Sequence, residues 1–267
     1  MSGLTQRYIS KDLFHFVGRG LKQDQQFNLL LKIVNEGWIT HPPHNPNISG
    51  NLSTNISAKI SNNEMYSPQI VCFSDIPIQD LSIHVKKYSA FGLSFSKEFV
   101  ASKGGIPVHY IPQGGAVRKM RDLKPDEISK ITSVSEHGIE KLLEHIYETA
   151  SNADFFDEML AEYHEVFRIF RDVALKIDPQ PGVPSLYKRV RDLERFLNFH
   201  IFSYFKFFDH TLDDDHKDNY YFEREWRVLG NVKFSLSDIK TIFLPTQFSE
   251  TFRGRYPQYS GQLIFVD

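Results

Sequence analysis

Cysteine is almost absent from this sequence, because Cys72 is the only one in 267 residues. A single cysteine excludes an internal disulfide, and a lone thiol in an otherwise unstapled chain favours a reducing compartment. Long apolar runs are also missing: no stretch of about 18 apolar residues occurs, and residues 1–11 are polar. We therefore expect a cytoplasmic protein with no membrane partner.

Neither sign of charge predominates either. The 31 Lys and Arg residues against 33 Asp and Glu residues leave a net charge of -2, which by itself indicates neither a nucleic acid nor an anionic membrane as partner. No Walker loop, Gly-x-Gly-x-x-Gly or Gly-x-Ser-x-Gly motif is present. His41 and His44 flank two prolines and have no cysteine nearby, so we predict no metal site.

Alternating apolar residues predict several short strands. The first covers residues 12–17, and a helix follows over 24–36, where Gly37 provides a C-terminal cap. Residues 40–68 are rich in turn formers, which predicts a lid, a binding loop or disorder. Further strands are predicted at 69–76, 91–96, 108–112, 240–245 and 262–266, with a helix ending near residue 88.

Residues 125–206 differ in kind from these flanking segments. Their apolar residues recur at spacings of three and four, as in Ile139 to Ile146, Met159 to Val173 and Leu193 to Ile201. This periodicity predicts three or four helices. We therefore expect an α+β fold with a β-rich core formed by residues 1–124 and 207–267 and a helical insertion at 125–206.

The most informative stretch is 220–230, which is rich in aromatic and β-branched residues and predicts a strand. In a strand Glu223, Glu225 and Arg227 share one face, since successive side chains alternate. Two carboxylates on one surface can stabilise a cationic transition state or accept a sugar hydroxyl. An ordinary solvated strand face with a cross-strand ion pair is the plainer interpretation.

The order of these elements resembles the ADP-ribosyltransferase-like fold, a split β-sheet core found in bacterial toxins and phage-defence proteins. The likeness rests on a first strand with histidine, a Cys-Phe-Ser strand, a Phe-Gly-x-x-Phe strand and a late Glu-x-Glu-Trp-Arg strand. More narrowly, residues 71–77, 88–99 and 107–111 look like the AbiG-type abortive-infection phage-resistance family, whose name is linked to antitoxins. That narrower likeness spans about residues 10–112 and 219–267.

The transferase resemblance implies roles for individual residues, with NAD as the substrate. His15 would hold the ribose of NAD, and Ser74 and Tyr88 would brace the nicotinamide. Glu225 would bond the nicotinamide-ribose hydroxyl, and Glu223 would orient the acceptor nucleophile. This sequence has Phe73 and Ser74 where related chains carry a tyrosine on the second strand.

Two further residues are assigned from physical chemistry. Arg19, between two glycines, can pair with the pyrophosphate of NAD, because a guanidinium matches phosphate oxygens. Phe91 or Phe73, with Tyr88, would supply an aromatic face for the nicotinamide ring. Cleavage of the nicotinamide–ribose bond passes through an oxocarbenium-like state, which a carboxylate such as Glu225 stabilises.

Each of these residues also has a structural interpretation. His15 can be a core histidine, Tyr88 can close a helix against the sheet, and Ser74 can cap a helix or satisfy a turn. Arg227 is expected to pair with a carboxylate in either case.

The sequence therefore supports two functions from different classes. The leading hypothesis is an NAD-dependent ADP-ribosyltransferase that modifies a macromolecular acceptor, which can be protein, RNA or DNA, as a toxin or in phage defence. The alternative is a catalytically inactive antitoxin or regulator that binds a cognate toxin. Nucleic-acid binding through the basic clusters at 188–195 and 118–121 is a third and weaker interpretation, because acidic neighbours at 192 and 194 offset the first.

Overall fold

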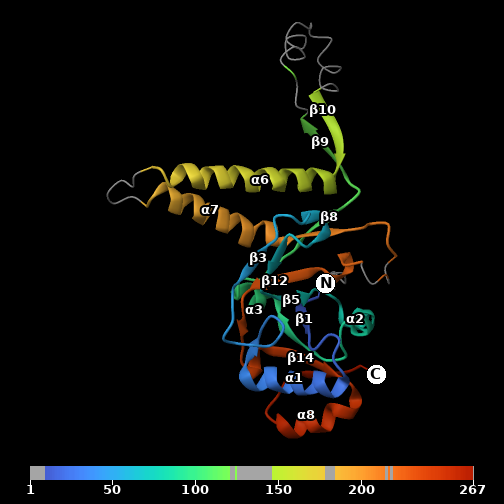
Figure 1. Ribbon diagram of the computed structural model, residues 1–267. Coiled ribbons are helices and arrows are strands. Elements are labelled where there is room, and N and C mark those ends of the chain that lie inside the picture. The colour runs from blue at the N-terminus through green and yellow to red at the C-terminus, as the bar shows by residue number, and fades with distance from the viewer. Residues whose placement is uncertain are drawn as a thin grey trace, which may run out of the picture.

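The computed structural model describes residues 10–120, 124, 146–177, 184–213, 216 and 219–266. Its core is a mixed seven-stranded sheet (Figure 1). β14 and β15 pair in parallel, and all other neighbours in this sheet are antiparallel. In spatial order the strands are β15 (Gln262–Phe265), β14 (Ile239–Leu244), β6 (Gly92–Ser96), β1 (Asp12–Phe16), β5 (Ile70–Ser74), β12 (Glu225–Leu229) and β7 (Ile106–Pro107).

Helices cover both faces of this sheet. α1 (Gln23–Glu36) and α8 (Ser249–Arg255) lie together below β14 in Figure 1, and their apolar residues join the largest core cluster with those of the central strands. α1 ends at Gly37, whose φ of 68° is the left-handed conformation that glycine adopts most readily. On the other face α2 (Leu81–Lys87) packs through Leu81 against Phe14 and Phe243.

The sheet is split at its centre. β1 pairs with β6 over five residues and β12 pairs with β5 over five residues, but β1 and β5 pair only at Phe14 and Ser74. Beyond this pair the C-terminal half of β1 and the N-terminal half of β5 diverge. Two firmly paired half-sheets therefore flank a gap, and the backbone groups along this gap are available to form hydrogen bonds with side chains.

A long arm projects from the core (Figure 1). It consists of α6 (Asn152–Ala174) and α7 (Leu186–His200), and α6 follows directly on β10 (Tyr147–Ser151), which pairs antiparallel with β9 (Ala116–Met120). Beyond α7 the chain returns to the core through β11 (Phe205–Phe208), which pairs in parallel with β8 (His109–Pro112). Among the described residues the remaining α-helix is α3 (Lys97–Ser102), and the remaining strands form the pairs β2 (Trp38–Ile39) with β13 (Val232–Lys233) and β3 (Leu52–Thr54) with β4 (Tyr66–Pro68).

The α+β class is thus confirmed, and the strands and helices predicted before residue 113 and after residue 238 are found with small shifts at their ends. Three predictions need correction. Within residues 125–206 the described part contains β10, two long helices, a 3-10 turn and the start of β11, and most of the predicted helix at 139–146 lies outside the described residues. Residues 40–68 include the β3–β4 hairpin. The domain boundaries themselves stay a prediction.

The third correction concerns the start of the Glu-x-Glu strand. Tyr221–Glu223 forms a single 3-10 turn, Arg224 has a φ of 43°, and β12 begins only at Glu225. The side chain of Asn219 accepts the backbone N–H of Tyr221, which favours a turn over an extended chain. Within the described ranges, no helix is long and apolar enough to cross a membrane.

Candidate functional site

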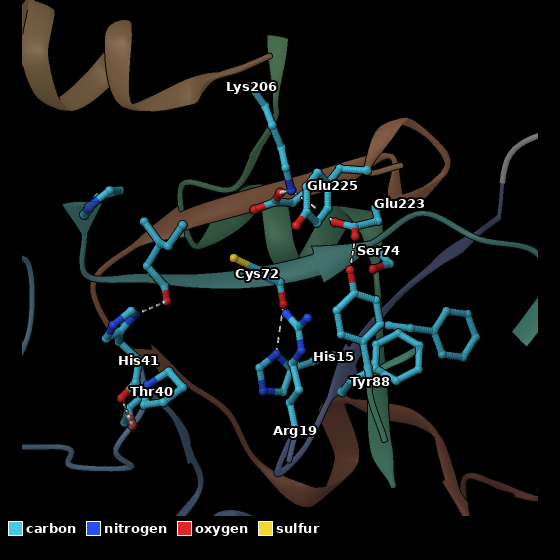
Figure 2. A pocket seen from close by; sticks show the side chains of 16 residues that line it. His15, Arg19, Thr40, His41, Cys72, Ser74, Tyr88, Lys206, Glu223 and Glu225 are labelled. Atoms are coloured by element: carbon cyan, nitrogen blue, oxygen red, sulfur yellow. Dashed lines mark hydrogen bonds and ion pairs between the residues drawn. The ribbon is translucent and has the colours of Figure 1, made fainter. Parts of the chain in front are cut away.

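A cavity of about 350 Å³ lies where β1 and β5 diverge (Figure 2). Its walls come from both half-sheets, from the loop after β2, and from two late segments around residues 206 and 220–225. The lining residues are Phe14, His15, Phe16, Arg19, Thr40, His41, Pro42, Pro68, Ile70, Cys72, Ser74, Tyr88, Lys206, Tyr220, Glu223 and Glu225.

The structure brings together six of the seven residues singled out from the sequence. They come from four separate segments of the chain and meet at this one cavity: His15, Arg19, Ser74, Tyr88, Glu223 and Glu225. The register explains part of this convergence, since Phe14 pairs with Ser74 and Ser74 pairs with Glu225 across three adjacent strands.

Phe91 is the exception. Its side chain is completely buried and packs against Phe27 of α1 and against Phe248, on the core side of the sheet. Phe73, the other candidate ring, is also buried in this cluster. In this structure neither ring lines the cavity, so Phe91 does not have the predicted position for a nicotinamide contact. Phe14, Phe16, Tyr88 and Tyr220 line it instead, and the rings of Phe16 and Tyr88 are 5.4 Å apart between centroids.

Glu225 is buried between two cations. Arg227 donates from Nε to Oε1 of Glu225 at 2.8 Å, and Lys206 Nζ lies 2.6 Å from Oε2. Burial alone would raise the pKa of Glu225, but the charges of Arg227 and Lys206 outweigh it and lower this pKa to about 2. Glu225 is therefore ionised at neutral pH, and each of its oxygens holds a cation. Arg227 pairs with a carboxylate, as the sequence predicted.

Glu223 has a different electrostatic balance. Its carboxylate accepts hydrogen bonds from Lys87 at 3.1 Å, from Lys206 at 3.1 Å and from the Tyr88 hydroxyl. Burial raises its pKa, the charge of Lys87 opposes this rise, and the nearby Glu225 carboxylate adds to it, so the pKa reaches about 7. The pKa values of the two carboxylates therefore differ widely, although one lysine bridges them.

That lysine, Lys206, is the main residue that the sequence analysis missed. It belongs to β11 and reaches from the base of the arm down to both carboxylates (Figure 2). Burial lowers its pKa, and the charge of Glu225 opposes that shift. A signal was present in the sequence. Lys206 stands between Phe205 and Phe207 and is the one charged residue of an aromatic run that alternates like a strand.

The gap in the sheet also positions His15. Its Nδ1 atom lies 2.9 Å from the carbonyl oxygen of Cys72, a group that a continuous ladder would have paired with β1. Burial lowers the pKa of His15, which favours the neutral imidazole. The Cys72 thiol is open to the cavity yet surrounded by protein, and this burial together with the Glu225 charge raises its pKa well above the usual value.

The loop after β2 forms part of the cavity wall. Thr40, His41 and Pro42 line it, and His41 Nδ1 lies 3.3 Å from the carbonyl oxygen of Ile70. His44 faces away toward Glu36, with its Nε2 atom 2.8 Å from Oε2 of that residue. Among the described residues no group of His, Cys, Asp or Glu is arranged to hold a metal ion.

The cavity combines aromatic rings, cations and carboxylates. The guanidinium of Arg19 lies 5.0 Å from the centre of the Tyr88 ring, and no described residue forms an ion pair with it within 4.0 Å. A guanidinium beside a ring suits a planar, anionic ligand such as a nucleotide. The carboxylates, in contrast, already have all four oxygens engaged by protein donors.

Residues 47–252 match the family described as "Putative abortive phage resistance protein AbiGi, antitoxin". This match covers more than half of the chain, so the chain belongs to that family, and the AbiG-type family predicted from the sequence is confirmed. No curated protein and no solved structure matches the chain. The ADP-ribosyltransferase-like character of the sheet therefore stays a prediction.

Proposed function

We propose, from membership of the AbiGi family, that the chain is the antitoxin of a phage-defence pair and restrains a cognate toxin by binding it. In this proposal the split-sheet cavity retains the residues of a nucleotide site without turning NAD over. The family description supports the defence role and implies a toxin partner.

One observation carries the non-catalytic part of the proposal: Lys206 bridges Glu223 and Glu225. A carboxylate stabilises an oxocarbenium-like state when its charge is directed at the ribose. Glu225 instead directs its charge at Lys206 and Arg227, which together carry one more positive charge than Glu225 carries negative. The negative charge of the carboxylate best placed for catalysis is therefore already compensated by cations of the protein.

The test is co-expression of the chain with its cognate toxin. If restraint depends on binding alone, the wild-type chain and Glu225→Gln restore growth equally, provided that immunoblots show equal amounts of both. Loss of rescue by a folded Glu225→Gln chain would contradict the proposal and favour catalysis.

The second candidate is an NAD-dependent ADP-ribosyltransferase with a macromolecular acceptor. Its support is the convergence of His15, Arg19, Ser74, Tyr88, Glu223 and Glu225 on one cavity in a split sheet. Such an enzyme would need Lys206 to move when substrate binds, so that Glu225 meets the ribose.

Nicotinamide release separates the two candidates. The purified chain is incubated with millimolar NAD and cell lysate, and nicotinamide is measured by chromatography. The antitoxin proposal expects the same background release from the wild-type chain and from Glu225→Gln. Release at least about a hundredfold higher from the wild-type chain, the scale of one transition-state contact, would establish the transferase.

A further inference from the structure

The cavity and the ion pairs that border it hold more positive than negative charge. We define the charge cluster as the four cations and two carboxylates that meet here: Arg19, Lys87, Lys206, Arg227, Glu223 and Glu225. With both carboxylates ionised, the charge cluster retains two positive charges. Positive charge that the surrounding protein does not balance attracts an anionic ligand.

Arg19 is the cation of the charge cluster that is available to such a ligand. The other three cations each hold a carboxylate oxygen at 3.1 Å or less. Arg19, in contrast, forms no ion pair within 4.0 Å among the described residues. A guanidinium presents a fork of N–H donors that matches the oxygens of a phosphate. The side of the cavity at Arg19 is therefore a phosphate site in its charge and its hydrogen-bonding geometry.

An aromatic wall lies directly beside this phosphate site. The guanidinium of Arg19 is 5.0 Å from the centre of the Tyr88 ring, and the Phe16 ring is 5.4 Å from that of Tyr88 (Figure 2). Both rings are half-buried and line the cavity, and the Tyr88 hydroxyl bonds Glu223, which holds its ring in place. Nucleobases stack on aromatic side chains and on arginine. A phosphate site beside an aromatic wall thus fits a ligand in which a base and a phosphate are joined.

His15 supplies a hydrogen-bond acceptor in the same cavity. Its Nδ1 atom lies 2.9 Å from the carbonyl oxygen of Cys72, which can only accept, so Nδ1 carries the proton. In the neutral imidazole the Nε2 atom is then an acceptor. Such an atom suits a sugar hydroxyl or the amino group of a base, and a nucleotide has both.

Charge also distinguishes a terminal phosphate from NAD. A phosphate monoester has a second pKa of about 6 and carries close to two negative charges at neutral pH. Each phosphate of NAD carries a single negative charge, and its nicotinamide ring is a cation. In the arrangement that the sequence predicted for NAD, this cation would lie beside Glu225, whose charge Lys206 and Arg227 already exceed. The cavity of about 350 Å³ is also near the small end of the range of roughly 300–1,000 Å³ for ligand sites.

We infer that the split-sheet cavity binds a nucleoside monophosphate, with the phosphate on Arg19 and the base against Phe16 and Tyr88. The inference rests on the proposed function in one respect, namely that the cavity holds a nucleotide without turning it over. Restraint of the toxin is measured separately by co-expression. A chain that rescues growth without binding the nucleotide therefore refutes this inference alone, and a chain that binds the nucleotide without rescuing growth refutes the antitoxin alone.

Isothermal titration calorimetry of the purified full-length chain with AMP tests the inference. The titration is done at low ionic strength and pH 8, where both carboxylates of the charge cluster are ionised. We expect a dissociation constant below about 1 mM. Adenosine lacks the phosphate and ribose 5-phosphate lacks the base, so each should bind at least about tenfold more weakly. NAD should also bind at least about tenfold more weakly than AMP, because its charge matches the cluster less well.

Two substitutions change the charge in opposite directions. Arg19→Gln should raise the dissociation constant of AMP at least about tenfold, the scale of a hydrogen bond to a charged group, and abolish the preference for AMP over adenosine. Glu223→Gln removes a negative charge from the cluster and should lower the dissociation constant of AMP several-fold. Arg253→Gln, at an exposed arginine of α8 outside the cavity, is the matched control and should bind AMP as the wild type does. Circular dichroism verifies that each variant is folded.

Three results would overturn the inference. The first is no detectable binding of AMP at about 5 mM, and the second is unchanged AMP binding by a folded Arg19→Gln chain. The third is NAD bound more tightly than AMP, which would favour the transferase candidate instead.

Discussion

Lys206 Nζ lies 2.6 Å from Oε2 of Glu225, although the two residues belong to different strands of different sheets. The pair joins the base of the arm to the centre of the split sheet. Because both side chains are largely buried, removing either partner leaves a buried charge uncompensated, which costs more than breaking an exposed ion pair.

The first prediction concerns this pair. Lys206→Met removes a cation that pairs with two buried carboxylates. Glu225→Gln removes the anion that pairs with Lys206 and Arg227. Each should lower the free energy of unfolding by about 3 kcal/mol at pH 7. The double variant should lose at least about 1 kcal/mol less than the two single losses combined, since the pair is then absent altogether.

Urea unfolding followed by circular dichroism measures these values. Lys240→Met and Glu250→Gln, which alter exposed residues of the same kinds, are the controls and should change stability by under about 0.5 kcal/mol. If the losses in free energy of unfolding caused by Lys206→Met and Glu225→Gln simply add in the double variant, the contact between the two residues does not contribute to stability.

The second prediction is a pH dependence set by Glu223. Its pKa is about 7 in the folded protein and near 4.5 without burial. Between these values the folded state retains a proton that the unfolded chain has lost, so the free energy of unfolding falls as pH rises from about 4.5 to 7. The contribution is about 3 kcal/mol at most. Glu225, with a pKa of about 2, acts oppositely and loses its stabilising effect only as pH falls from about 4.5 toward 2.

Unfolding curves at pH 5, 6, 7 and 8 test this effect by difference. The buried histidines add their own pH dependence to both proteins, so the comparison is between the wild-type chain and Glu223→Gln. We expect the variant to lose less stability than the wild type between pH 5 and 8. Parallel pH profiles for the two proteins would exclude a raised pKa at Glu223.

The third prediction concerns the closeness of β6 to its neighbours. A Cβ atom on Gly92 would lie 2.2 Å from the Phe243 ring and 2.3 Å from the His15 carbonyl oxygen. Gly92→Ala therefore has to displace β1 or β14, and we expect a loss of more than about 2 kcal/mol. Gly254 in α8 has no atom within 4 Å of such a Cβ, so Gly254→Ala should be neutral or stabilise by up to about 1 kcal/mol. Thermal unfolding of both variants distinguishes a local clash from a general intolerance of alanine.

Local patterns predicted most of the core. The helical period of residues 24–36 and the cap at Gly37 depend only on neighbouring residues, and α1 is found where they predict it. The convergence of His15 and Glu225 was predicted only through a family resemblance, because residues 210 positions apart leave no local signal. Lys206 was assigned to the helical insertion, since nothing near it in sequence shows that its partners are on β12 and the preceding turn.

Alternation also has a physical limit, which Phe91 illustrates. Phe91 directly precedes β6, a central strand of which four of the five residues are buried whichever face they point to. On such a strand the alternation of side chains gives two faces but does not tell which one lines a cavity. The sequence therefore could not distinguish a ring in the core from a ring in the site.

The last prediction follows from the position of Phe91. Its ring is fully buried between Phe27 and Phe248, so Phe91→Ala leaves a cavity in the main core and should lower the free energy of unfolding by about 3–5 kcal/mol. Phe222→Ala, at a ring that is 44 % exposed, should cost under about 1 kcal/mol. If Phe91 instead faced a ligand in the cavity, its removal would leave the stability of the unliganded chain nearly unchanged. Urea unfolding of the unliganded Phe91→Ala and Phe222→Ala chains therefore decides between a core ring and a ligand-binding ring.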